Sequence, residues 1–149
     1  CGVTINLDND ISLNTVEYTN PGSSGQYYGE IAGFGGIDNA LAAGELAVLN
    51  TSLGSPQWYE ADYNTSINAT GMLGIYTGSE ILLRGKVRLS TYSLGTANGA
   101  PVYMGATGAI SLSAPTGNGD FVRIIGYVTD YAGDEIYFCP DNTWVEITA

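Results

Sequence analysis

The feature that most constrains this chain is the repeated alternation of short apolar runs and clusters of turn residues between Gly99 and Glu146. Clusters of Gly, Pro, Asn and Asp fall at 106–108, 115–120, 132–134 and 140–142, and Val, Ile, Tyr and Phe fill the intervals. This pattern is typical of an antiparallel all-β domain. No segment here has apolar residues at helical spacing over about two turns. The stretch therefore predicts strands at 102–104, 109–113, 121–129, 136–139 and 143–148.

The preceding part of the chain predicts strands at 45–50, 57–61 and 72–76, with a polar loop at 62–70. The clearest strand is 81–89, where residues alternate between two faces. One predicted face carries Ile81, Leu83, Val87 and Leu89. The other carries Leu82, Arg84, Lys86 and Arg88. Three of the four basic residues of the chain thus share one strand face, and the fourth, Arg123, lies in the 121–129 strand.

Two glycines interrupt otherwise regular strands. Gly85 and Gly126 are expected to mark bulges or sharp bends, which are common uses of glycine inside strands. About ten short strands without helices predict a small antiparallel β-barrel or a sandwich, and the glycines favour the barrel. Residues 41–149 are expected to form this module. Residues 1–40, with strands at 3–7 and 26–31, are expected to form an extended arm that can pair with a neighbouring subunit.

Composition excludes several classes of partner. The 149 residues include 15 acidic and 4 basic side chains, for a net charge of −11. Nucleic acid is not expected, because phosphate binding requires clustered Lys and Arg. Membrane contact is not expected either, because anionic lipid repels a negative chain and no apolar run is long enough to span a bilayer. A hydrophobic content of 44% is enough for one domain with a core.

Catalytic and metal sites are also poorly supported. The chain has no histidine, which removes the common nucleophilic triads and zinc ligand sets. The acids Glu60, Asp62, Asp130 and Asp134 could act in pairs, but most fall at predicted turns, where such acids usually cap their own backbone. Oxygen donors at 8–10 and 141–143 could attract calcium, but Asx turns are the favoured interpretation. We expect no enzyme activity, no cofactor and no metal.

The two cysteines are Cys1 and Cys139. Cys139 lies in a predicted strand and is expected to be a small buried apolar residue. A disulfide between Cys1 and Cys139 is an alternative, but the spacing of the two cysteines gives no support for it. A chain that begins at Cys1 is expected to result from truncation or cleavage, and lipidation of Cys1 is the less favoured alternative.

Three segments of the chain carry a resemblance to a known family. They are GAPVYMGATG at 99–108, GDFVRIIGY at 119–127 and IYFCPDNTWVE at 136–146. The pattern, over about residues 41–146, resembles a β-module of tailed-bacteriophage structural proteins: head decoration or cement proteins, head fibres and tail fibres, especially of marine phages and cyanophages. The resemblance implies a virion protein that associates with itself, commonly as a trimer. It also implies contact with the major capsid protein or another virion protein.

The residues expected at an interface combine bases and aromatic side chains. They are Arg84, Lys86, Arg88, Tyr103, Arg123 and Trp144. The basic strand face has two interpretations: a solvated face with weak local ion pairs, or a strand that meets acids of a neighbouring acidic chain. The aromatic residues are expected in the core or at an interface, although Trp58 and Trp144 could instead form a sugar-binding platform. The alternative functions are therefore a carbohydrate-binding, host-recognition domain at a fibre tip and a subunit of a bacterial surface filament.

Overall fold

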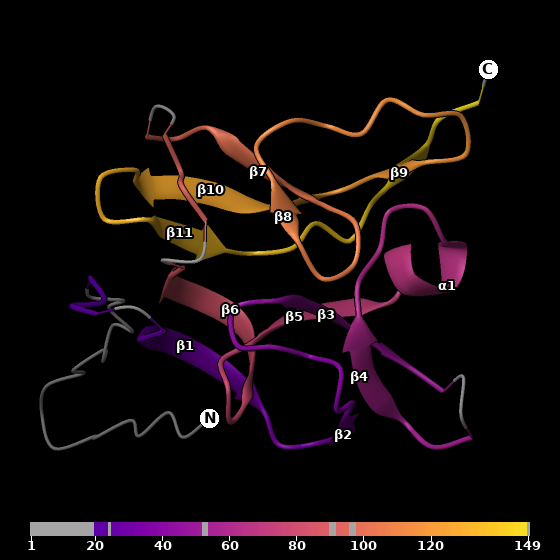
Figure 1. The fold of residues 1–149 in the computed structure, drawn as a ribbon, viewed down its shortest axis with the longest axis horizontal. Coiled ribbons are helices and arrows are strands. Elements are labelled where there is room, and N and C mark those ends of the chain that lie inside the picture. The colour runs from indigo at the N-terminus through magenta and orange to yellow at the C-terminus, as the bar shows by residue number, and fades with distance from the viewer. Residues whose placement is uncertain (1–19, 24, 52–53, 90–91, 96–97, 149) are drawn as a thin grey trace, which may run out of the picture.

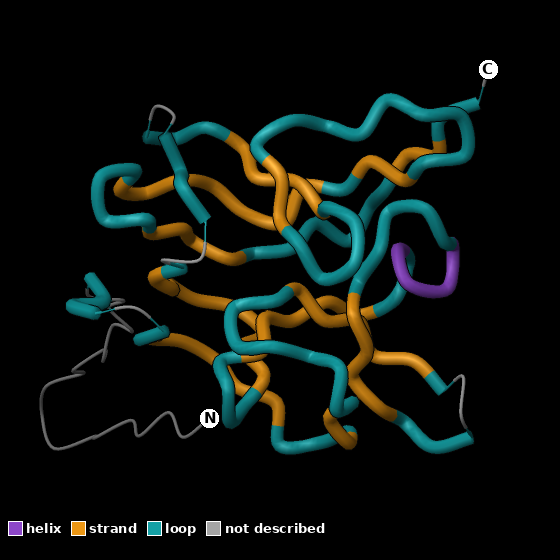
Figure 2. The backbone as a smooth tube through the Cα atoms, in the orientation of Figure 1, coloured by secondary structure: helices purple, strands orange, loops and turns teal. Residues whose placement is uncertain are grey.

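The computed structural model describes residues 20–23, 25–51, 54–89, 92–95 and 98–148. Within them the chain forms twelve strands and one short helix, so the predicted all-β class is confirmed (Figures 1 and 2). The elements of the first half are β1 (Tyr27–Ala32), β2 (Gly36–Ile37), β3 (Leu46–Asn50), β4 (Gln57–Glu60), α1 (Ser66–Ala69), β5 (Met72–Tyr76) and β6 (Ile81–Arg88). Those of the second half are β7 (Pro101–Met104), β8 (Ile110–Ser111), β9 (Phe121–Val122), β10 (Ile124–Asp130), β11 (Glu135–Phe138) and β12 (Val145–Glu146).

Ten of these strands form one mixed sheet in the order β2-β4-β3-β5-β6-β11-β10-β7-β8, with β1 paired to β6. All pairs are antiparallel except β2 with β4, and β12 forms a separate pair with β9. Within the described residues the order ends at β2 and β8 and does not close, so the preference for a barrel was wrong. Figure 1 shows a sandwich-like arrangement, with β1 to β6 in the lower half and β7 to β11 in the upper half.

Strand β6 belongs to both layers of this sandwich. Strand β1 pairs with β6 from Ile81 to Val87 along one edge. On the opposite edge, β5 pairs with Ile81 and Leu82, whereas β11 pairs with residues 85–88. The two layers therefore pair with the same edge of β6, one near its N-terminal end and the other near its C-terminal end.

A β-bulge separates the two branches. The β1–β6 register passes from Glu30 opposite Arg84 to Ile31 opposite Leu82, which leaves Leu83 as the extra residue of β6. An extra residue inverts the alternation of side chains. Leu82 consequently joins the main core together with Val87, and Ile81 packs on the other face. The prediction that one uninterrupted alternation runs from Ile81 to Leu89 was wrong, and Leu82 does not lie with the basic residues.

Close backbone approach explains the glycines at this point. Gly29 lies opposite Gly85, and Gly85 has a φ of +145°, a conformation that residues with side chains rarely adopt. A Cβ atom on Gly85 would lie 2.1 Å from the Tyr28 carbonyl oxygen, and one on Gly126 would lie 2.2 Å from the Tyr137 carbonyl oxygen. A register shift adjoins Gly126, and the β1–β6 shift lies at Leu83, two residues before Gly85. The prediction of a bulge is confirmed at Gly126, whereas Gly85 pairs in regular register with Gly29 and follows the bulge.

Apolar side chains of the two layers meet in one main core. It includes Leu46, Leu73 and Ile75 from the lower layer and Val102, Ile125 and Phe138 from the upper layer. A smaller cluster on the other face of the lower layer centres on Trp58, which is fully buried. The Trp58 indole N–H donates to the Phe34 carbonyl oxygen at 2.9 Å, so the chain between β1 and β2 covers this tryptophan.

Several predicted boundaries change in the structure. Residues 27–37 of the expected arm form β1 and β2 in the same sheet as the rest of the chain, and the expected strand at 3–7 lies outside the described residues. The predicted loop at 62–70 contains the single turn of α1. The expected strand at 121–129 is divided at Arg123 into β9 and β10, and the final strand is reduced to β12.

We expect Gly85→Ala to lower the free energy of unfolding by at least about 2 kcal/mol, because the new methyl group meets backbone atoms and the φ of Gly85 is unfavourable for alanine. Chemical denaturation measures the change. Gly33→Ala is the matched control, because a Cβ atom there meets nothing within 4 Å, and its effect should stay within about 0.5 kcal/mol. Equal stability of the two variants would contradict a tight approach of β1 to β6.

Candidate functional site: a pocket at the fork of the sheet

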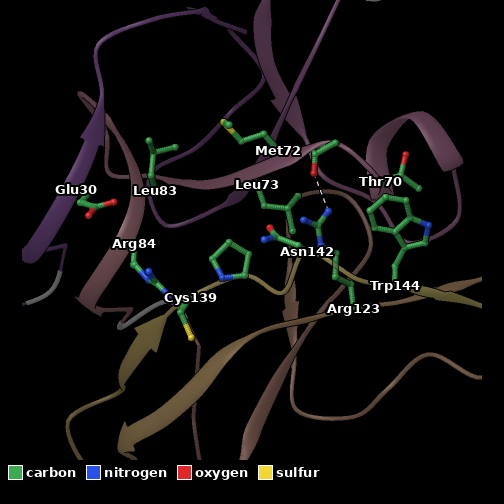
Figure 3. A pocket seen from close by; sticks show the side chains of 12 residues that line it. Glu30, Thr70, Met72, Leu73, Leu83, Arg84, Arg123, Cys139, Asn142 and Trp144 are labelled. Atoms are coloured by element: carbon green, nitrogen blue, oxygen red, sulfur yellow. Dashed lines mark hydrogen bonds between the residues drawn. The ribbon is translucent and has the colours of Figure 1, made fainter.

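The divergence of β5 and β11 from β6 leaves a pocket of about 430 Å³ between the two layers. No strand of the described residues pairs with Leu83 or Arg84 on this edge of β6. We call this space the fork pocket. It is lined by Glu30, Thr70, Gly71, Met72, Leu73, Leu83, Arg84, Arg123, Cys139, Pro140, Asn142 and Trp144 (Figure 3).

Arg123 is the buried cation of the fork pocket, with 4% of its surface exposed. It occupies the break between β9 and β10. Its Nη1 donates to the carbonyl oxygens of Ala69 at 2.9 Å and Gly71 at 2.7 Å, and its Nε donates to that of Asp141 at 2.8 Å. Arg123 thereby satisfies carbonyl groups at the end of α1, where a helix leaves such groups unpaired. One side chain thus connects the lower layer, the upper layer and the C-terminal segment.

The electrostatics of Arg123 follow from this burial. Desolvation lowers the pKa of the guanidinium from its usual value, and the nearby Asp141 carboxylate partly opposes the shift. An arginine nevertheless stays charged in proteins. The Cζ atom of Arg123 lies 5.5 Å from the centroid of the Trp144 ring, within the range of a cation–π contact. The tryptophan ring covers one side of the cation and remains 42% exposed.

A short segment after β11 forms one wall of the fork pocket. The N–H groups of Cys139 and Asp141 donate to the carbonyl oxygens of Ile125 and Ile124, at 3.0 and 2.9 Å, which holds the segment against β10. The Asp141 carboxylate accepts hydrogen bonds from the N–H and the hydroxyl of Thr143 at 3.1 and 3.0 Å. These bonds, led by the one from the Thr143 N–H, lower the pKa of Asp141. The predicted Asx turn at 141–143 is confirmed.

The opposite wall comes from β6 and β1. Arg84 is exposed on β6, and in Figure 3 it lies on the other side of Asn142 from Arg123. Glu30 of β1 is the register partner of Arg84 and the acidic residue of the lining. Cys139, a free thiol among the described residues, is only partly buried, and this burial raises its pKa.

The structure thus brings together three of the six residues that the sequence assigned to an interface: Arg84, Arg123 and Trp144. The other three lie elsewhere. Lys86 forms an ion pair with Glu135 of β11 at 3.3 Å and donates a hydrogen bond to the Asn20 side chain. Arg88 donates to the Gly22 carbonyl oxygen at 3.3 Å. Tyr103, half-buried in β7, lies opposite Ile124 and Ser111.

The acids considered for catalysis hold local structure. The Asp62 carboxylate accepts a hydrogen bond from the Asn64 N–H, and the Asp130 carboxylate accepts one from the Ala132 N–H. The Asp134 carboxylate accepts from the Leu94 N–H at 3.2 Å. Burial raises the pKa of Glu60, and the nearby Glu45 carboxylate adds to the effect. The part of the chain that the structure describes holds no group of three or more acidic or cysteine side chains placed to bind a metal ion. Nor does any helix in it have the length and apolarity to cross a membrane.

The two tryptophans differ in a way that the sequence did not indicate. Trp58 lies in the core, as one of the two interpretations expected, so it cannot contribute a face to a shared sugar platform. Trp144 is exposed at the fork pocket. Sequence reasoning also missed Asn142 and Leu83 as lining residues. Three successive apolar residues at 81–83 break strict alternation, and that was the available signal for a bulge and a fork here.

Comparisons with known proteins give no relative for this chain: no family model matches its sequence, and neither a curated protein nor a solved structure matches it.

We expect Arg123→Lys to lower the free energy of unfolding by about 2–4 kcal/mol, because a lysine ammonium cannot reach three separated carbonyl oxygens with the planar donors of a guanidinium. Arg84→Lys, a matched change at an exposed position, should alter stability by less than about 0.5 kcal/mol. Thermal or chemical denaturation compares the two variants. Comparable losses, or none, would show that the Arg123 contacts do not hold the layers together.

A soluble quencher distinguishes the two tryptophans. Acrylamide should quench the Trp144 component of the fluorescence and leave the Trp58 component largely unquenched, because Trp58 is fully buried. Trp144→Phe should therefore remove most of the quenchable emission. Quenching that persists unchanged in this variant would mean that Trp58 is open to solvent.

Proposed function

We propose that this chain is a non-enzymatic structural module of a bacteriophage virion that associates with copies of itself and decorates the capsid. The resemblance of residues 41–146 to phage structural modules supports the class of protein, and an all-β sandwich suits a mechanical role. The observation that carries self-association is the outer edge of β1.

Strand β1 presents an open edge with apolar side chains. It pairs with β6 along one side, and no strand of the described residues pairs with its other side. Ile31 is 46% exposed on β1, and Phe34 is 50% exposed just beyond it. Tyr28 and Ile37 extend the same apolar run. An unprotected edge of this kind is a template for pairing with another chain. Its occupant in this proposal is a different edge strand of a second copy, because such a head-to-tail contact can close a ring of three copies, whereas β1 paired with β1 would close as a two-fold dimer.

The charges of the chain favour contact at this place. Each copy carries a net charge of −11, so two copies repel unless they meet where acids are sparse. Within β1 the only charged residue is Glu30, and it faces Arg84 across the ribbon. Lys86 is already paired with Glu135 of its own chain. Association through β1 therefore depends on apolar burial and backbone pairing, and it should persist at high salt.

The higher assembly follows from the resemblance. Phage proteins of this kind are commonly trimers, so we propose a trimer that contacts the major capsid protein or another virion protein. On a capsid, such a module would bridge neighbouring capsomers and resist the internal pressure of packaged DNA.

Native mass by light scattering, at low and high salt, tests self-association. We expect a discrete trimer at both salt concentrations and dissociation by Ile31→Asp, which places a charge on the contact edge. Ile67→Asp is the matched control, because Ile67 is equally exposed on α1, away from β1. A monomeric wild-type protein, or a trimer that Ile31→Asp leaves intact, would overturn association through β1. Open-ended polymers would favour the bacterial filament instead.

Immunoelectron microscopy of phage particles from the source of the gene tests the location. Labelled heads support capsid decoration. Labelled fibre tips would favour the host-recognition alternative, and particles without label would contradict the virion assignment.

A further inference from the structure

The fork pocket concentrates positive charge in an acidic protein. Two of the four basic residues of the chain, Arg84 and Arg123, line this one space, and Glu30 is the acid that lines it with them. The lining therefore has a positive balance although the chain has a net charge of −11. Neither arginine has an ion-pair partner among the described residues. A pocket whose cations lack paired acids favours a ligand that carries a negative charge.

Arg123 is held in position for such a contact before any ligand arrives. Its hydrogen bonds to Ala69, Gly71 and Asp141 use three of the five N–H donors of a guanidinium. No described residue accepts a hydrogen bond from its second terminal nitrogen, Nη2. This nitrogen is not fully buried, so a ligand can reach it. The two N–H donors of Nη2, on a side chain that is 96% buried, are thus available to a ligand in the pocket.

The rest of the lining is not that of a simple anion site. Asn142 brings an amide, which suits hydroxyl groups of a ligand, and the Thr70 hydroxyl, which donates to the Ser66 carbonyl oxygen at 2.9 Å, remains an acceptor. Met72, Pro140 and Trp144 bring apolar surface, which suits the C–H face of a sugar ring. A volume of about 430 Å³ lies in the range of small-molecule sites.

From these contacts we infer that the fork pocket binds a carboxylated sugar, a hexuronic acid or an acidic sugar of similar size, either free or as a unit of an acidic polysaccharide. The carboxylate meets the exposed Arg84 at one end of the pocket, and the free donors of Arg123 meet hydroxyl groups of the ring at the other end. The ring lies against Met72 and Trp144, and Asn142 meets its hydroxyl groups. This site is independent of the β1 edge, so either proposal can fail without the other.

Two other ligand classes use only part of the lining. Inorganic phosphate and acetate engage the arginines and leave the apolar residues without a role. An acidic peptide supplies a carboxylate but no ring of hydroxyl groups for Asn142 and Thr70. These ligands serve as comparison probes.

Isothermal titration calorimetry with glucuronic acid, galacturonic acid, glucose, acetate, inorganic phosphate and a glutamate-containing peptide tests the inference. We expect one of the two uronic acids to bind at about millimolar concentration, and glucose to bind at least about tenfold more weakly because it lacks the carboxylate. Binding of the uronic acid should also protect Trp144 from acrylamide.

Variants then assign the binding to this pocket. Arg84→Gln should weaken uronic acid binding by about tenfold, the loss expected for one charge-assisted hydrogen bond. Arg88→Gln, on the same strand but outside the lining, should leave it unchanged. Trp144→Ala should weaken it, whereas Tyr131→Ala, at an equally exposed aromatic residue elsewhere, should not.

Three outcomes would overturn the inference. Neither uronic acid binds, or Arg84→Gln and Arg88→Gln behave alike, or acetate, phosphate or the peptide binds as tightly as the better uronic acid.

Discussion

The fold depends on one strand that two layers share. Strand β6 accepts β1 along one edge and, on the other edge, accepts β5 and then β11. A strand can serve both layers only if its direction changes between them, and the bulge at Leu83 and the unusual φ of Gly85 supply that change. Gly29 lies opposite Gly85 because any side chain at either position would collide with backbone atoms. Two small residues on two strands therefore determine where the sandwich bends.

The fork pocket is a direct consequence of this geometry. Where β5 and β11 leave β6, neither can fill the space between them, so side chains from five separate segments meet there. Arg123 replaces the missing strand pairing with hydrogen bonds to carbonyl oxygens on both sides of the gap. Its charge is stabilised by oriented carbonyl dipoles and by the Trp144 ring. The same residue that closes the structure also leaves donors on the wall of the pocket.

The sequence predicted local structure better than it predicted assembly of the site. Runs of β-branched and aromatic residues between turn clusters predicted all the longer strands, because strand and turn propensities are local. The same reasoning assigned Leu82 to the wrong face of the strand. A bulge inverts the alternation of side chains between the two faces, and it does so without changing the composition of the strand. It named Arg84, Arg123 and Trp144, but as members of one interface with Lys86 and Arg88. Their convergence depends on pairings between β6 and strands distant in the chain, and no local pattern encodes that.

The shared strand also has a consequence for synthesis of the chain on the ribosome. Strands β1 to β6 emerge first and can pair at once, which completes the lower layer. Its inner face, with Leu46, Leu73 and Ile75, then has no cover until β10 and β11 have been made. At ordinary translation speeds that delay is on the order of several seconds. For this interval the nascent chain carries a finished half-sandwich with a bare apolar surface and an unoccupied edge on β6, so the late strands have to reach their place before another nascent chain does.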